Sequence, residues 1–198
     1  MARDYRAARH KESAFRGWTN AAGQTRIDMA QHPDNIDVEI DPAHFRSVLG
    51  NYPTGVCVVT AFDQQAGAVG MVVGSFGSVS LEPPLVAFYI GAGSSSWAQI
   101  RECGHFCVNV LGEDQLDLCK RIASRKEDKF HDVAHRQSDN GMPVLDGVVA
   151  TIECTIESET DAGDHVIVLG RVMNLTSERD GGPLLFFRGG YGRFEQLD

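Results

Sequence analysis

The chain has 198 residues and a mass of 21.6 kDa, a length that suits one domain with or without a tail. Its 18 Lys and Arg residues against 27 Asp and Glu residues give a formal net charge of −9, which disfavours nucleic acid and membrane surfaces as partners. Hydrophobic residues make up 42% of the chain, enough for a core, but no apolar run approaches the roughly 20 residues of a membrane span.

The chain divides into a polar N-terminal segment and a longer segment that is expected to fold. Residues 1–38 show no sustained hydrophobic periodicity and predict a tail, or an arm that packs on a partner subunit. Residues 39–198 are expected to form the domain. Its first element is a helix, because Asp41 can cap it, Pro42 suits its first position and Gly50 can end it. The expected buried face of this helix carries apolar residues at helical spacing: Phe45, Val48 and Leu49.

Beyond this helix the sequence is mainly typical of β-strands. Runs of β-branched and aromatic residues predict seven strands, at 56–61, 68–73, 85–90, 106–111, 151–157, 165–172 and 183–187. Two further helices are expected, near 97–102 and 113–124. Several strands with short helical insertions favour a closed or half-closed antiparallel barrel over a parallel sheet with crossover helices. The predicted fold class is therefore all-β with short helices.

The five cysteines indicate a reducing compartment. Their number is odd, no C-x-x-C pair occurs, and the N-terminus has no apolar stretch of a secretory signal. We therefore expect buried free thiols and a cytoplasmic protein. His131 and His135 lie one helical turn apart and could be half of a metal site, but a solvated segment explains them better, so no metal site is predicted.

Three stretches could carry chemistry, although the common hydrolase and nucleotide-binding motifs are absent. The Gly- and Ser-rich segment 70–86 suits close approach to a flat ligand, but on physical grounds alone a strand-turn-strand ending at two prolines explains it better. In segment 91–97, Ser94 to Ser96 can cap a helix whose first-turn N–H groups would suit a phosphate, or can form a plain cap. The third stretch contains His165 at a strand start, where a lone histidine is usually structural.

Taken in order, these stretches resemble the flavin reductase family, the NAD(P)H:flavin oxidoreductases that serve as reductase components of two-component monooxygenases. The residues that carry the resemblance extend over about 41–194 and comprise 45–46, 52–56, 75–76, 78–84, 163–165, 170–172 and 183–191. The resemblance implies an FMN-binding split β-barrel with Greek-key connections, assembled as a homodimer with flavin beside the interface. It also implies FMN or FAD as the flavin, NADH or NADPH as the co-substrate, and a flavin-dependent monooxygenase as the partner.

The resemblance also implies a set of site residues. Those matched to the family's flavin contacts are Pro53, Thr54, Gly55, Val72, Val73, Gly74, Ser75, Phe76, Ser80, Pro83, Ser94, Ser95, Ser96, Trp97, Lys129, Phe130, Tyr191 and Arg193. Within this set, residues 73–76 would follow the isoalloxazine edge, and residues 94–97 would receive the phosphate. His165 matches the histidine near the nicotinamide, and its expected role is to position NAD(P)H.

The sequence departs from the family pattern at the flavin edge. Many members have Thr and Asn where this chain has Val72 and Gly74, so a hydroxyl and an amide are lost. Backbone amides could replace them, or flavin could bind loosely and be released. Two alternatives stay open: an oxidase of the same fold that retains its flavin, and a non-catalytic flavin- or haem-binding module.

Overall fold

The computed structural model describes residues 17–19, 25–27, 39–124 and 128–197, and it separates into two units, Met1–Asp41 and Pro42–Asp198. In the first unit, β1 (Gly17–Thr19) and β2 (Thr25–Ile27) form an antiparallel pair. Most of the predicted tail, residues 1–38, lies outside the described residues, so that prediction stays untested.

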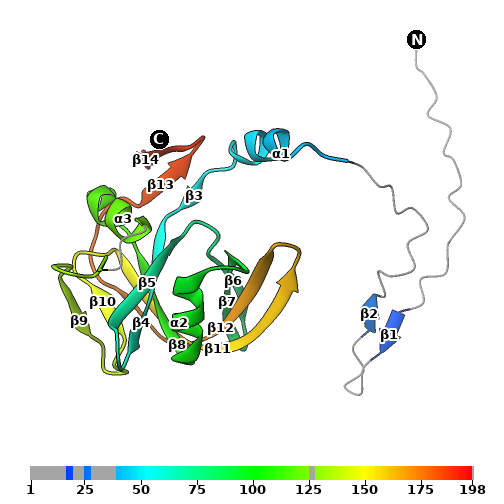
Figure 1. Cartoon of the computed structure of the whole chain (residues 1–198). Helices are drawn as coiled ribbons and strands as arrows, with labels where there is room; N and C mark the ends of the chain where they lie inside the picture. Colours follow the sequence, from blue (N-terminus) through cyan, green and yellow to red (C-terminus); the bar gives the residue numbers. More distant parts are fainter. Residues whose placement is uncertain (1–16, 20–24, 28–38, 125–127, 198) are drawn as a thin grey trace, which may run out of the picture. The chain divides into compact units, whose positions relative to one another are not determined.

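A seven-stranded antiparallel sheet forms the body of the second unit (Figure 1). Its strand order is β5-β4-β8-β11-β12-β7-β6. The strands are β4 (Cys57–Asp63), β5 (Gly67–Val73), β6 (Gly77–Leu81), β7 (Pro84–Gly91), β8 (His105–Val110), β11 (Ala150–Ala162) and β12 (His165–Ser177). Consecutive strands form the hairpins β4–β5, β6–β7 and β11–β12, while β8 pairs with β4 and β11, which lie far from it in the sequence.

The two outermost strands of this order, β5 and β6, follow each other in the chain. Among the described residues no ladder joins them, so the sheet stays open where residues 74–76 connect them. This antiparallel, partly open arrangement confirms the predicted all-β split barrel. All seven predicted strands are present, and the hairpin β11–β12 is longer than predicted, with 13 residues in each strand.

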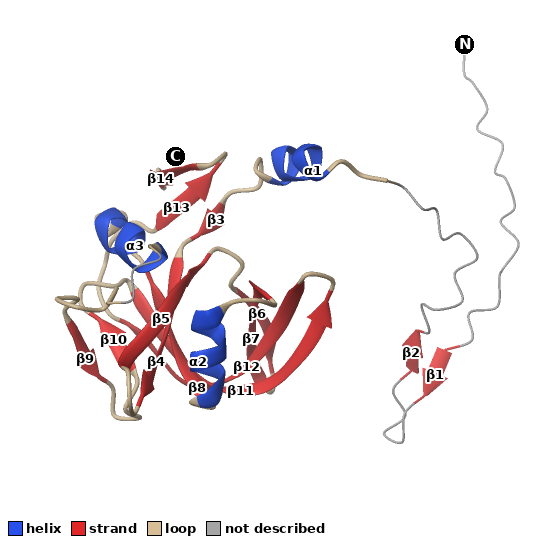
Figure 2. Cartoon of the chain, in the orientation of Figure 1, coloured by secondary structure: helices blue, strands red, loops and turns tan. Residues whose placement is uncertain are grey.

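Two smaller sheets complete the unit (Figure 2). One has the order β14-β13-β3, formed by β3 (Thr54–Gly55), β13 (Leu184–Phe187) and β14 (Gly190–Arg193). The other pairs β9 (His135–Gln137) with β10 (Pro143–Leu145). β3, β6, β9, β10 and β14 are absent from the sequence-based prediction, because short strands carry too few residues for a clear alternation.

The three helices of the second unit differ in what they bury. α2 (Ser95–Glu102) and α3 (Leu116–Ala123) each place two side chains in the core. α1 (Pro42–Leu49) places none there, and its apolar side chains Phe45, Val48 and Leu49 are 51%, 50% and 55% exposed. The prediction that these three are buried is therefore wrong for the single chain, because no residue of α1 is buried against the barrel. No described helix is long and apolar enough to cross a membrane.

The barrel core consists of two main clusters that share β4. Alternate residues of a strand point to opposite faces, so Cys57, Val59 and Ala61 join one cluster and Val56 and Val58 join the other. The first cluster contains Trp97 and Ile100 of α2, and the second contains Cys119 and Ile122 of α3. Both helices are thereby fixed against the barrel, on either side of β5.

Candidate functional site

The N-terminus of α2 is the most clearly built candidate site. Ser94 has extended backbone angles, and its hydroxyl accepts a hydrogen bond from the Trp97 N–H at 3.2 Å, as an N-cap does. The Lys129 ammonium reaches this turn and donates to the Ser96 hydroxyl at 3.0 Å and to the Gly70 carbonyl at 3.4 Å. Three segments that are distant in the sequence therefore meet at one helix end.

This helix end is suited to an anion. Partial burial lowers the pKa of the Lys129 ammonium, and no carboxylate within 39–124 or 128–197 forms an ion pair with it. The free N–H groups of the first turn of α2 add partial positive charge. A phosphate placed here would meet both sources of positive charge. Receiving the phosphate is the role predicted for residues 94–97, whereas Lys129 was predicted only as a flavin contact.

Gly70 on β5 allows Phe130 and Lys129 to lie against the strand. A Cβ atom at position 70 would lie 2.8 Å from Phe130 Cζ and 2.7 Å from the Val59 carbonyl oxygen, closer than real contacts. Only glycine fits without a shift of the backbone or of the Phe130 ring. The sequence did not single out Gly70 as part of a site, and its only signal was an isolated glycine inside a strand pattern.

The turn after β5 lies beside β3. A Cβ atom at Gly74 would lie 3.0 Å from Thr54 Oγ1, so the predicted flavin-edge residue 74 and the predicted contacts 54 and 55 are neighbours. Thr54 thus presents a hydroxyl close to the position where the family's usual amide is missing. Pro53 precedes β3 and is exposed.

Several residues that were predicted to contact flavin use their side chains for contacts within the protein. Val73 and Trp97 are each only 4% exposed, and the Trp97 indole packs edge-to-face on Phe88 at 5.4 Å. A surface ligand can therefore meet only the backbone of these two residues. The Ser75 hydroxyl donates to the Tyr89 carbonyl and accepts from the Tyr89 N–H, both at 2.9 Å, so it fixes the turn to β7. Phe76 packs against the first core cluster, and Val72 packs against the second.

His165 borders the loop that leads into α2. It pairs with Gly91 across β12 and β7, and the Ala92 N–H donates to the Asp164 carbonyl at 3.0 Å. Its imidazole Nδ1 lies 2.7 Å from Asp164 Oδ1, and this hydrogen bond, with the charge of His165, lowers the pKa of Asp164. Asp164 is a residue that the sequence reasoning did not assign to the site, although it directly precedes His165.

The C-terminal strands approach the same region through β3. Phe186 pairs with Thr54 and contacts Tyr191 at 5.2 Å between ring centroids. The Tyr191 hydroxyl lies 3.5 Å from Cys119 Sγ, and this hydrogen bond, together with burial, raises the pKa of Tyr191 to about 12. Arg193 pairs with Leu184 in β13 and is exposed.

Two residues that were predicted to contact flavin, Ser80 and Pro83, lie in the β6–β7 hairpin. Ser80 pairs with Leu85 within the β6–β7 hairpin, and Pro83 lies at its tip after a cis peptide bond. Neither hydrogen-bonds to the side chains at α2 in the described part of the chain. Their assignment to a turn beneath the flavin stays a prediction.

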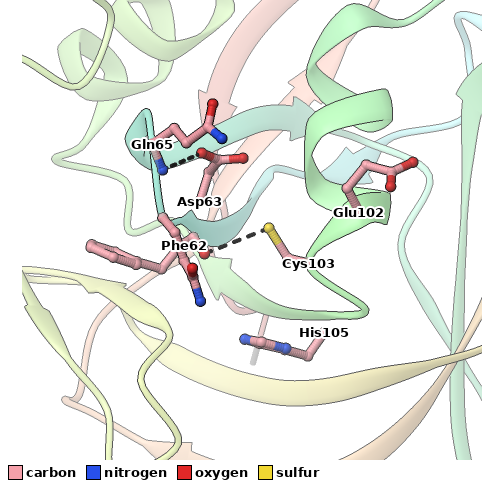
Figure 3. A pocket seen from close by; sticks show the side chains of 7 residues that line it. Phe62, Asp63, Gln65, Glu102, Cys103 and His105 are labelled. Carbon is pink, nitrogen blue, oxygen red and sulfur yellow. Dashed lines mark hydrogen bonds between the residues drawn. The ribbon is translucent and has the colours of Figure 1, made fainter.

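Two surface hollows flank the β4–β5 turn. Figure 3 shows the first, where Phe62, Asp63, Gln65, Glu102, Cys103 and His105 line a hollow beside the end of α2. Cys103 Sγ donates there to the Phe62 carbonyl at 3.6 Å. The second hollow is lined by Ala66, Ala68, Asp128, Phe130, His131 and His135. Among the described residues no group of three His, Cys, Asp or Glu side chains is arranged for a metal ion, and His131 pairs instead with Asp132.

Comparisons with known proteins find relatives that match most of this chain. Residues 49–195 match the family described as "Flavin reductase like domain". A flavin reductase of Pseudomonas putida is 57% identical over 158 residues, which cover 80% of this chain and 93% of that protein. The reductase subunit HsaB of a flavin-dependent monooxygenase from Rhodococcus jostii is 47% identical over 156 residues, 79% of this chain and 80% of that protein. Among solved structures, the NADH:FAD oxidoreductase SgcE6 of Streptomyces globisporus, in complex with NAD and FAD fragments, aligns with a TM-score of 0.74 at 34% identity, covering 80% of this chain and 97% of that one.

Proposed function

The chain belongs to the flavin reductase family, and from this premise we propose that it is an NAD(P)H:flavin oxidoreductase. It transfers hydride from a reduced nicotinamide nucleotide to FMN or FAD and supplies the reduced flavin to a partner monooxygenase. The single observation in this chain that carries the proposal is the meeting of Lys129, Ser96 and Gly70 at the N-terminus of α2. These residues lie far apart in the sequence and together form a receptor for a phosphate.

The residues present fit a flavin phosphate. The ammonium of Lys129 has no acidic partner in the described residues, and the adjacent first turn of α2 supplies N–H donors. The turn 73–75 would follow the ring edge through its backbone, because its side chains are buried, absent or bonded to Tyr89. The Thr54 hydroxyl would add the polar group that Gly74 lacks. Bound flavin supplies the hydride acceptor, so this chain needs to bind and orient the two reactants rather than provide a general base.

His165 positions the nicotinamide nucleotide in this proposal. The Asp164 carboxylate accepts a hydrogen bond from Nδ1 at 2.7 Å and so fixes the ring orientation, which leaves Nε2 free toward the exposed side. The Ala92 hydrogen bond to Asp164 holds this pair at the loop that begins α2. The nucleotide and the flavin phosphate would thus be received on two sides of one short loop.

A homodimer is part of the proposal. Phe45, Val48 and Leu49 of α1 are about half exposed, and α1 is held to the β13–β14 turn by hydrogen bonds from Arg188 to Gly50 and Asn51. Phe186, Phe187 and Phe194 add further exposed apolar surface at the C-terminus. A surface of this kind is typical of a subunit interface. Light scattering should give twice the 21.6 kDa chain mass, and a monomer over the micromolar range would contradict the dimer.

Release of the product follows from the weak flavin edge. Val72 and Gly74 offer no side-chain hydrogen bond to a ring and leave Thr54 as the polar side chain proposed at this edge, so we expect flavin to exchange and to reach a monooxygenase as the reduced species. We also propose a cytoplasmic location, which the odd number of cysteines and the lack of a C-x-x-C pair favour.

The proposal is tested by following NADH and NADPH oxidation with FMN, FAD and riboflavin supplied in turn. We expect flavin-dependent oxidation by the purified protein, at a rate well above that of the nucleotide and flavin alone. A protein that purifies with flavin that neither nucleotide can bleach would instead indicate a binding module. Oxidation of an organic substrate by permanently bound flavin would indicate an oxidase.

A further inference from the structure

The second hollow beside the β4–β5 turn has no role in the function proposed above. It has a volume of about 310 Å³ and is lined by Ala66, Ala68, Asp128, Phe130, His131 and His135. Two of these residues, Asp128 and Phe130, flank Lys129 in the chain. The hollow therefore begins where the proposed phosphate receptor ends.

Strand β5 extends from the hollow, at Ala68, to the proposed phosphate receptor, at Gly70. Ala68, Gly70 and Val72 share one face of this strand, since side chains alternate along it. Gly74 follows the strand at the end where the flavin ring is proposed to lie. The Gly70 carbonyl accepts a hydrogen bond from Lys129, where the flavin phosphate is proposed to lie. At roughly 3.3 Å per residue, Ala68, which lines the hollow, lies about 7 Å beyond Gly70 along the strand. A ligand that continues past the phosphate in this direction enters the hollow.

The walls of the hollow are held in place. Phe130 packs on Gly70 and meets His135 edge-to-face with 6.4 Å between ring centroids. Arg121 of α3 donates to the Lys129 carbonyl at 3.1 Å and also to the His131 carbonyl. The segment that carries Asp128 and Phe130 is thus fixed to α3, and the hollow is lined by its aromatic ring together with small alanine side chains.

The polar groups of the hollow match a nucleoside. His135 Nδ1 lies 2.8 Å from the Val133 carbonyl, which can only accept, so in the neutral imidazole Nδ1 is the donor and Nε2 is an acceptor. Adenine presents an amino donor to such an acceptor, and the Asp128 carboxylate can accept from ribose hydroxyls. An aromatic ring beside small residues also suits a flat base.

We propose that this hollow binds the adenosine of FAD, whose pyrophosphate lies at Lys129, and that the protein therefore prefers FAD to FMN. The inference rests on the proposed flavin reductase function. FAD fits better than the adenosine of NAD(P)H. His165 pairs with Gly91 and Asp164 with Ala92, at the loop before α2, whereas Ala68 of the hollow lies on the strand whose Gly70 carbonyl accepts from Lys129.

The test compares two tryptophan substitutions in one turn. Ala66→Trp would fill the hollow. Gln64 also lines the other hollow, the one in Figure 3, so Gln64→Trp would place a ring of the same size there instead. Asp63 Oδ1 accepts from the Ala66 N–H at 2.7 Å, a backbone bond that both variants keep. His135→Phe is the second test variant, because it keeps a ring beside Phe130 and removes the acceptor.

The readout is the KM for FAD divided by the KM for FMN, with NADH saturating. We expect a ratio below one for the unmodified protein, a rise of about tenfold in Ala66→Trp and about fivefold in His135→Phe, and no change in Gln64→Trp. FMN reduction at the normal rate shows that each variant is folded; if Ala66→Trp loses it, His135→Phe decides.

An unchanged ratio in either folded test variant overturns the proposal, and so does a rise in the KM for NADH measured with FMN, which would assign the hollow to the nicotinamide nucleotide. Failure of the unmodified protein to oxidise NADH with any flavin would instead overturn the proposed function itself.

Discussion

Lys129→Met is the substitution that most sharply tests the phosphate receptor. It removes the ammonium and its donors to Ser96 and Gly70 but keeps most of the aliphatic stem that packs against the barrel. Since no acidic partner in the described residues neutralises Lys129, the whole charge is available to a phosphate. The variant should therefore bind phosphorylated flavins less tightly and leave the ring-binding turn unaltered.

The size of the effect follows from the partial exposure of Lys129. A hydrogen bond to a charged group contributes about 1.5–3 kcal/mol, and solvent screening at a half-buried side chain favours the low end. A loss of about 1.4 kcal/mol corresponds to a tenfold weaker equilibrium. We therefore expect the KM for FMN and for FAD to rise about tenfold.

Riboflavin, which has no phosphate, is the matched ligand control. Its KM should stay the same in Lys129→Met, and Lys120→Met, which removes an exposed cation of α3, should leave all three flavins unaffected. Steady-state oxidation of NADH measures every value. An equal rise for riboflavin and FMN would refute the reasoning, because Lys129 would then act by holding the fold rather than by meeting a phosphate.

Further predictions concern the nucleotide, the strand packing, the acid stability and the thiols. His165→Ala should raise the KM for NAD(P)H far more than the KM for flavin, and an unchanged nucleotide KM would exclude the positioning role. Gly70→Ala should cost roughly 1–3 kcal/mol through overpacking and lower Tm by several degrees in calorimetry; an unchanged Tm would contradict the close approach of Phe130. Burial acts to raise the pKa of Glu178, but hydrogen bonds from Arg136 and Thr151 lower it overall. Because its carboxylate is favoured in the folded state, its stabilisation is present at neutral pH and lost as pH falls below about 5, so Glu178→Gln should lose less stability than the unmodified protein over that range; equal losses in acid titrations followed by circular dichroism would contradict this. In the native state a thiol reagent should modify only Cys103, since the other four cysteines are buried, and all five after denaturation; rapid native labelling of a second thiol would show that the core opens.

Much of the fold is predictable because its strands are long and strongly patterned. The runs at 56–61 and 106–111 are almost wholly apolar and become β4 and β8, two interior strands of the sheet that are buried on both faces. The Ser94 cap of α2 was also recognisable, since a serine before a helical pattern is a local signal. Such local signals do not depend on the rest of the fold.

What the sequence could not predict depends on tertiary contacts. The amphipathic pattern of α1 predicts a buried face, but a pattern does not state whether the partner surface lies in the same chain. The bond between Lys129 and Ser96 joins residues 33 positions apart, and no spacing rule links them. Ser75 and Trp97 matched a family motif, yet their side chains are committed to Tyr89 and to the core, which only packing decides.

The central claim is that this chain catalyses hydride transfer between a reduced nicotinamide and a flavin. Its most direct test is an anaerobic single-turnover experiment, in which the protein is mixed with FMN or FAD and then with NADH or NADPH. We predict rapid loss of the flavin's visible absorbance, one nucleotide consumed for each flavin, and a slower reaction when deuterium replaces the transferred hydrogen. Absorbance that persists with every combination of flavin and nucleotide would contradict the account.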